Sequence, residues 1–372
     1  MIQSPEYSLE KAKEYQKIKQ KLTFVHLFLT PAILLVAIAT PLSIHFKDWA
    51  LGIHSHPSIA LALYFLFFSL FMMIFDLPLG FYSGFILEHR FRLSNQTFGV
   101  WAQDFLKKSV LSFVFSLLLL LALYALIWHF PATWWVWAWA SFALVSYVMG
   151  KLFPVLIVPL FYKYGKVEDQ ALKSRILALA ARYSLPVGNV YSLNLSKTTK
   201  KANAAFMGMG KTKRVVLSDT LIEKFTADEI ETVVAHELGH YKHHDIWKQL
   251  GLGLITSLAG FWIVSRAVDP AAGVFHLQGA ADVAAMPLVF LIFYLFYLVL
   301  TPVQNGYSRI VERAADRFSL EAFPYPDIFI SCMDKLGKVN LSDPEPHSLI
   351  EWFFYDHPAI GKRIQMAKEW KK

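Results

Sequence analysis

The sequence has 372 residues, of which 55% are hydrophobic and 16% aromatic, and it carries a formal net charge of +8. This composition is too apolar for an ordinary soluble chain and predicts a protein embedded in a membrane. The positive charge fits contact with anionic lipid, and the sequence has no compact basic and aromatic motif that would predict nucleic-acid binding.

Residues 1–22 are polar and rich in lysine, with glutamates between the lysines. We expect them to form a charged, helical segment on the cytoplasmic side of the membrane. Ala37-Ile38-Ala39 is similar to a signal-peptidase site, but the segment before it is long and acidic for a signal peptide, and the apolar run continues to Phe46. A retained membrane span is therefore favoured over a cleaved signal.

Six apolar runs are long enough to cross a bilayer, which takes about 20 residues. They occupy residues 23–46, 58–82, 109–130, 134–162, 247–268 and 284–303. We predict four transmembrane helices within residues 23–165 and two within residues 246–305. Residues 166–245 have the mixed charge of a globular domain, and residues 306–372 form a C-terminal segment.

The distribution of lysine and arginine predicts the orientation. These residues are frequent in the N-terminal segment, the second connection, the globular stretch and the C-terminal segment, and rare in the first, third and fifth connections. With six spans, the positive-inside rule then places both termini and the globular domain in the cytoplasm.

The sequence His-Glu-Leu-Gly-His occupies residues 236–240, in a stretch that we expect to be helical. Four residues apart on a helix, His236 and His240 share one face and can bind one Zn²⁺ ion. Glu237 can then act as a general base toward a water molecule at the metal. A solvated polar face is the alternative, but residues 226–229 form a capping box and an apolar stripe leads from it into the motif.

A catalytic zinc needs a third protein ligand, for which we predict Glu312. His243 and His244 would extend along the helix past a metal already held by the first two histidines. Asp269 and Asp282 fall in the fifth connection, on the opposite side of the membrane. Glu312 is the next acid after the sixth span brings the chain back, and two histidines with one glutamate leave an open position for water.

Asp316 follows Glu312 by one helical turn and lies on the same face. It can accept the second N–H of a zinc-bound imidazole and fix its tautomer. Ala314 and Ala315 favour close packing of this segment on another helix, although a polar face on a surface helix is the alternative.

With these residues in place, the sequence resembles the type 1 CaaX prenyl endopeptidases, a family of integral-membrane zinc proteases. The resemblance implies a mainly α fold, a multi-span membrane helical barrel around a large chamber, closed by a gluzincin-like zinc-protease domain with a small β-sheet. It also implies one Zn²⁺ per chain and removal of three residues after a prenylated cysteine. The matching stretches are His236 to His240, the Ser-Arg-x-x-Glu-x-x-Ala-Asp run at 308–316, Asn203-Ala204 before Gly208, Asp356-His357-Pro358 followed by Arg363, Glu88 to Thr97, and Phe153 to Phe161.

The resemblance assigns further site residues. It implies that Asn203, Ala204 and Arg363 bind substrate and that His357 stabilises the transition state. From the residues alone, His357 is either an oxyanion donor or structural, and Asn203 is equally well a turn residue. Family members commonly have seven spans, so we expect this chain to begin after the first of them and its chamber to be opened or narrowed.

Two strand-like runs flank the Asn203 segment, around Tyr191 and at Val215-Val216-Leu217. They predict a short sheet beside the zinc helix, whose edge can hold an extended peptide by backbone hydrogen bonds. Cys332, the only cysteine, is expected to be a buried, inert thiol. The His54-Ser55-His56 pair is expected to lie in a solvated loop.

Two other functions stay open at this point. One is a quality-control protease that cuts unfolded membrane proteins without a prenyl requirement. The other is a catalytically inactive membrane scaffold stabilised by zinc, but a structural site needs no base such as Glu237 and is usually closed by a fourth protein ligand. Intramembrane proteolysis is less favoured because residues 226–245 carry too many charges for hydrocarbon.

Overall fold

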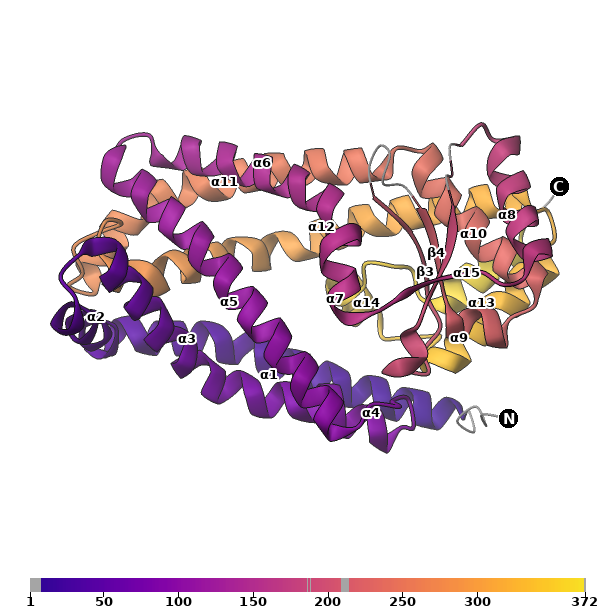
Figure 1. Ribbon diagram of the computed structural model, residues 1–372, viewed down its shortest axis with the longest axis horizontal. Helices are drawn as coiled ribbons and strands as arrows, with labels where there is room; N and C mark the ends of the chain where they lie inside the picture. Colours follow the sequence, from indigo (N-terminus) through magenta and orange to yellow (C-terminus); the bar gives the residue numbers. More distant parts are fainter. Residues whose placement is uncertain (1–7, 186, 188, 209–213, 371–372) are drawn as a thin grey trace.

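The computed structural model describes residues 8–370 except 186, 188 and 209–213. Long helices make up one half of the molecule, and a small sheet with shorter helices makes up the other (Figure 1). Helix α12 runs from the first half into the second, so the two halves share one continuous element.

The long-helix half contains six helical stretches, among the described residues, that are long and apolar enough to cross a membrane. Their number agrees with the six predicted spans, and they form a multi-span helical barrel. Two short π-helical turns, at Tyr82–Ile86 and Phe153–Ile157, join α3 to α4 and α6 to α7. The helices of this half are α1 (Leu9–Ala39), α2 (Leu42–Ile53), α3 (Pro57–Phe81), α4 (Leu87–Arg90), α5 (Phe98–His129), α6 (Trp134–Leu152), α7 (Val158–Phe161), α11 (Asp245–Val274) and α12 (Met286–Ala322).

Three predicted boundaries do not coincide with the helices. The apolar run 23–46 is not one helix, because α1 ends at Ala39 and α2 begins at Leu42. Thr40, between them, is extended, as expected for a residue that precedes proline. The boundary at residue 22 falls inside α1, and the boundary at residue 305 falls inside α12, since neither position carries a residue that breaks a helix.

The sheet has four strands in the order β1-β2-β4-β3. β1 pairs antiparallel with β2, β2 pairs parallel with β4, and β3 pairs antiparallel with β4. β3 therefore forms one edge of the sheet, with Ala205 opposite Val216. The strands are β1 (Tyr164–Lys166), β2 (Val190–Leu193), β3 (Ala204–Met207) and β4 (Arg214–Ser218).

Helices surround this sheet and share a core with it. Val215 and Leu217 of β4 pack in one cluster with Val234 and Leu238 of α10 and with Phe318 of α12. Short 3-10 turns lie at Leu195–Lys197 and Val283–Ala285. The helices of this half are α8 (Gln170–Arg182), α9 (Asp219–Lys224), α10 (Ala227–Lys242), α13 (Pro326–Asn340), α14 (Ser348–Phe354) and α15 (Ile360–Lys368).

Cys332 lies in the same core and is fully buried. Burial raises the pKa of its thiol to about 12, so the thiolate does not form near neutral pH. The predicted inert thiol agrees with this environment.

Gly239 sets how closely α10 and α12 approach. A Cβ atom at Gly239 would lie 3.1 Å from Cα of Ala315 and 3.1 Å from Cδ1 of Phe318. Both distances are tighter than ordinary van der Waals contact, which begins at 3.4 Å. The absence of a side chain here lets α12 bring its polar face against α10.

Candidate active site and metal centre

The start of α10 is fixed by a capping box. The Thr226 side chain accepts from the backbone N–H of Glu229, and the Glu229 carboxylate accepts from the backbone N–H of Thr226, as predicted. Glu229 also contacts Lys335 of α13 at 2.9 Å. The cap and the buried Val233 and Val234 fix the rotation of α10, and with it the direction in which the next turn projects its histidines.

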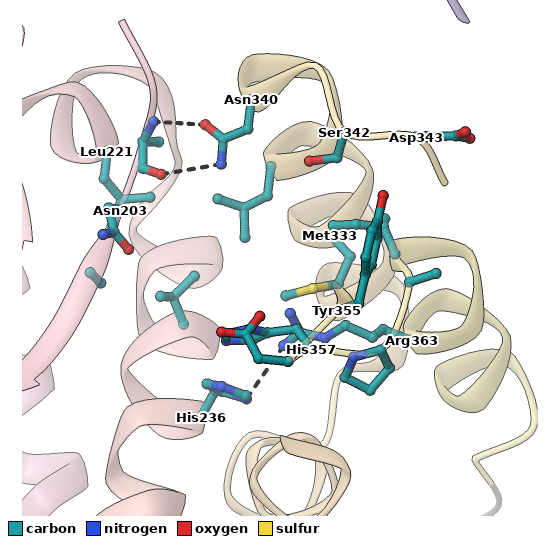
Figure 2. A pocket seen from close by; sticks show the side chains of 18 of the residues that line it. Asn203, Leu221, His236, Met333, Asn340, Ser342, Asp343, Tyr355, His357 and Arg363 are labelled. Carbon is teal, nitrogen blue, oxygen red and sulfur yellow. Dashed lines mark hydrogen bonds and ion pairs between the residues drawn. The ribbon is translucent and has the colours of Figure 1, made fainter. Parts of the chain in front are cut away.

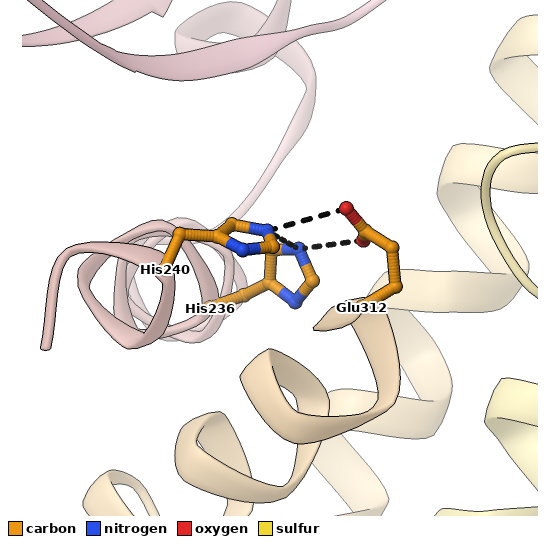
Figure 3. A group of neighbouring side chains, drawn as sticks. All are labelled: His236, His240 and Glu312. Carbon is orange, nitrogen blue, oxygen red and sulfur yellow. Dashed lines mark hydrogen bonds and ion pairs between the residues drawn. The ribbon is translucent and has the colours of Figure 1, made fainter. Parts of the chain in front are cut away.

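Figure 3 shows three possible ligands converging from α10 and α12. The Nε2 atoms of His236 and His240 are 3.2 Å apart. Nε2 of His236 is 3.2 Å from Oε2 of Glu312, and Nε2 of His240 is 3.3 Å from Oε1 of Glu312. For a tetrahedral zinc ion with bonds of about 2.0–2.1 Å, neighbouring donor atoms are about 3.3 Å apart. The donor types and their separations therefore fit one such ion.

The hydrogen bonding of the cluster supports the same conclusion. Oε2 of Glu312 is buried and accepts no hydrogen bond from the described residues, although it faces His236. Burial by itself lowers the pKa of His236, but the carboxylates of Asp316 and Glu312 outweigh it and raise the pKa to about 9. The surroundings thus favour positive charge at this position, which a divalent cation would supply.

In both His236 and His240, the ring nitrogen that points away from the cluster, Nδ1, lies beside a carboxylate. Nδ1 of His236 is 2.9 Å from Oδ1 of Asp316, the residue predicted for this place. Nδ1 of His240 is 3.1 Å from Oδ2 of Asp245, which we did not predict. Asp245 is buried at the first turn of α11, and the left-handed backbone of His244 turns the chain between α10 and α11. Both contacts hold Nε2 toward Glu312, the arrangement typical of metal-binding histidines.

Arg363 of α15 lies behind His236. Its Nε donates to Oδ2 of Asp316 at 2.9 Å, and its second nitrogen contacts Oδ1 of the same carboxylate. The guanidinium therefore neutralises the buried Asp316 and fixes its position. It also lines the cavity described below, so its predicted part in substrate binding stays a prediction.

His357, in the segment between α14 and α15, lies beside Glu312. Its Nε2 is 3.3 Å from Oε1 of Glu312, and its Nδ1 is 2.9 Å from Oδ1 of Asp356. The hydrogen bond to Asp356 raises the pKa of His357 and leaves Nε2 pointing toward the ligands. The side chain is half exposed, so a bound peptide can reach it.

Arg309 holds the segment that carries His357. Its guanidinium donates to the backbone carbonyl oxygens of Glu351, Trp352 and Tyr355. Because Arg309 lies one turn before Glu312 on α12, the same helix positions a ligand and this segment. No local pattern assigns this role to Arg309, and its place in the 308–316 run is the only signal for it in the sequence.

A cavity of about 480 Å³ adjoins the cluster. Figure 2 shows Asn203 and His236 on one wall, with Tyr355, His357 and Arg363 on the other. Ala204 and Glu237 also line it. Asn340 bonds the backbone N–H and carbonyl of Ala202 at 3.1 and 3.3 Å, which joins the two walls above the site. The structure thus brings every predicted site residue into one region.

Glu237 connects the motif to the sheet edge. Its Oε2 accepts from the backbone N–H of Phe206 at 3.1 Å. Because backbone groups alternate along a strand, Ala204 directs its own N–H and C=O to this same side of β3, away from β4. A peptide placed beside β3 would therefore lie next to both Glu237 and the His-His-Glu cluster.

Two family models together match nearly the whole chain. The model of peptidase family M48 matches residues 166–371, and the model of the CAAX prenyl protease N-terminal region, with five membrane helices, matches residues 3–163. The first covers more than half of the chain and contains all the candidate ligands.

Individual relatives extend over nearly the full length. The metalloprotease YhfN of Bacillus subtilis, described as uncharacterized, is 31% identical over 96% of this chain and 85% of its own. CAAX prenyl protease 1 of Saccharomyces cerevisiae is 29% identical over 97% of this chain and 84% of its own.

A solved structure is also similar. The crystal structure of S. mikatae Ste24p superposes with a TM-score of 0.86 over 97% of this chain and 89% of that one, at 22% identity, which shows a shared fold. The family matches imply a metal cofactor, and the His-His-Glu cluster is compatible with one. The chain therefore belongs to peptidase family M48 and is an integral-membrane metalloprotease of the CAAX prenyl protease family.

Proposed function

We propose that His236, His240 and Glu312 bind one Zn²⁺ ion and that the chain is a zinc metalloendopeptidase. The separations of 3.2–3.3 Å between their donor atoms support zinc, as do the carboxylates of Asp316 and Asp245 on the outer imidazole nitrogens. Bound there, the ion acts as a Lewis acid that polarises a peptide carbonyl and lowers the pKa of a water molecule.

Glu237 is the general base in this mechanism. It takes a proton from the attacking water and passes it to the leaving amine as the peptide bond breaks. Its contact with Phe206 holds the carboxylate at the edge of β3, where the scissile bond of a paired peptide would lie. This placement of Glu237 between the ligand cluster and an open strand edge is the observation that carries the proposal.

His357 and β3 supply transition-state and substrate binding. His357 donates from Nε2 to the oxygen that becomes negatively charged when the carbonyl is attacked. The outward backbone groups of Ala204 pair with an extended peptide, and Asn203 binds it from the wall of the cavity. Arg363 lines the cavity and binds the peptide there. Its hydrogen bond to Asp316 also holds the carboxylate that orients His236.

For the substrate we infer a prenylated peptide with a CaaX C-terminus. Several relatives over most of the chain are named CAAX prenyl protease 1. In addition, the membrane half contains a cavity of about 700 Å³ with a mainly apolar lining, which suits a hydrocarbon chain. Leu34, Phe68, Met72, Phe113 and Phe290 are among its lining residues.

The test uses purified detergent-solubilised protein and one reporter peptide ending in a CaaX sequence, with and without a farnesyl group. We expect preferential cleavage after the farnesylated cysteine. Glu237→Gln should keep its zinc, measured by elemental analysis, and lose about 10²- to 10⁴-fold in turnover. Glu223→Gln, at an exposed glutamate of α9, is the matched control and should behave as wild type.

Two results would contradict the proposal. Equal cleavage of the farnesylated and unmodified peptides would indicate a quality-control protease with the same zinc chemistry. Full activity of Glu237→Gln would mean that another group is the base.

We further infer that the active site and both termini face the cytoplasm, since lysines and arginines are frequent in the connections on that side. In a Cys332→Ala background, Lys368→Cys on α15 should react with a membrane-impermeant maleimide only from the cytoplasmic side. His56→Cys, at the opposite end of the long helices, should react only from the other side. The reverse labelling would overturn the orientation.

A further inference from the structure

A separate pocket lies across α12 from the metal site. It has a volume of about 380 Å³ and separates the end of α10 from the outer face of α12. It lies outside the candidate active site, and none of the proposed ligands lines it. Its lining includes His243, Ile310, Arg313, Arg317, Phe318 and Glu321.

The pocket continues a lipid-facing stripe of α12. Val299, Val303 and Ile310 are 73%, 67% and 63% exposed, which places an apolar face of this membrane-crossing helix toward lipid. At 100° per residue, Arg317 lies about 20° and Arg313 about 60° from the centre of this face. The outer surface of α12 therefore changes from hydrocarbon-facing to basic within one turn after Ile310.

The basic groups of the pocket lack acidic partners. Arg313 and Arg317 are exposed and form no ion pair with any residue that the structure describes. Nδ1 of His243 is buried and has no hydrogen-bond partner among the same residues. Nearby, the Lys242 ammonium lies 4.6 Å from the Phe318 ring centre, and the one acid in the lining is Glu321. The pocket thus has an excess of unused donors and positive charge.

We propose that this pocket binds the phosphate of an anionic phospholipid. Two guanidinium groups one turn apart offer forked donors that match phosphate oxygens. From Arg313 back to Val303 is ten residues, or about 15 Å of helix, a length that the acyl chains of a phospholipid can follow. A phosphate at the arginines would place the acyl chains along Ile310 and Val303. A free phosphate ion would leave this apolar stripe unused.

The test measures lipid binding to the full-length protein in neutral detergent by native mass spectrometry. Wild type should bind phosphatidylglycerol in preference to phosphatidylcholine. Arg313→Gln/Arg317→Gln should weaken phosphatidylglycerol binding about tenfold or more for each guanidinium lost. Arg313→Lys/Arg317→Lys keeps the charge without the fork, so it should bind with intermediate affinity.

The control variant is Lys107→Gln/Arg266→Gln, which removes two exposed charges from other membrane helices. It should bind as wild type. Equal loss in this control would attribute binding to overall charge and overturn the site, as would wild-type binding by the double glutamine variant. Displacement of the lipid by an equal concentration of inorganic phosphate would overturn the lipid assignment in favour of a free anion.

Discussion

Replacing Gly239 by alanine should displace α12 from α10 and weaken the metal site. The new Cβ atom would lie 3.1 Å from the backbone Cα of Ala315, 0.3 Å short of the 3.4 Å at which ordinary contact begins. Neither backbone can rotate away, so the helices must separate by a few tenths of an ångström. Glu312 precedes Ala315 by less than one turn and moves with it. Metal–ligand distances tolerate about 0.2 Å.

The expected loss of zinc affinity is about 10- to 100-fold, comparable to removal of a carboxylate that hydrogen-bonds a metal-binding histidine. Overpacking should also lower the free energy of unfolding by about 1–3 kcal/mol. This loss outweighs the stabilisation of roughly 1 kcal/mol that alanine gives over glycine in a helix. Chelator competition gives the zinc affinity, and thermal unfolding in detergent gives the stability.

Gly251→Ala on α11 is the matched control for Gly239→Ala, since a Cβ atom there meets nothing within 4 Å. It should leave zinc affinity unchanged and stabilise the helix slightly. If Gly239→Ala bound zinc as tightly as Gly251→Ala, close packing of α10 and α12 would not be what sets the ligand geometry.

Three further perturbations test other parts of the site. Asp245→Asn should lower zinc affinity about 10- to 100-fold, because His240 loses its carboxylate partner; unchanged affinity in a zinc titration would refute that role. Arg309→Gln should lower kcat/KM about tenfold or more while zinc content stays constant, because the hydrogen bonds to three carbonyl oxygens that position the His357 segment are lost. An equal loss of zinc would instead show that the substitution disrupts the metal site itself. Removing the metal with a chelator should abolish cleavage and lower the unfolding temperature, and one equivalent of zinc should restore both; activity that survives complete removal would exclude a catalytic metal.

Local patterns were enough to predict the parts of the site that depend on one helix. His236, Glu237 and His240 are fixed relative to one another by helix geometry, and the capping box fixed where that helix begins. Glu312 and Asp316 form a similar local pair on α12. The six spans were predictable for the same reason, because length and hydropathy are local properties.

The contacts that could not be predicted join residues from different helices. Asp245 reaches His240 because the left-handed His244 turns the chain back, and nothing in a five-residue spacing requires that conformation. Arg309 contacts carbonyl groups more than forty residues later. Arg363 was assigned to substrate by resemblance, yet its nearest charged partner is Asp316. Each case depends on how α11, α14 and α15 pack, which no local pattern in the sequence determines.

Helix α12 joins the membrane half and the protease half without a break (Figure 1). The fall in hydrophobicity predicts a boundary at residue 305, but the helix runs unbroken for 37 residues, about 55 Å. The two histidines belong to α10, and Glu312 belongs to α12, which packs in the protease-half core through Phe318 and in the membrane-half core through Met286 and Leu288. The ligand set is complete only while α10 and α12 keep their contact at Gly239. Gly239 at the helix contact and Arg309 at the C-terminal segment therefore support the chemistry as directly as the partners of the ligands do.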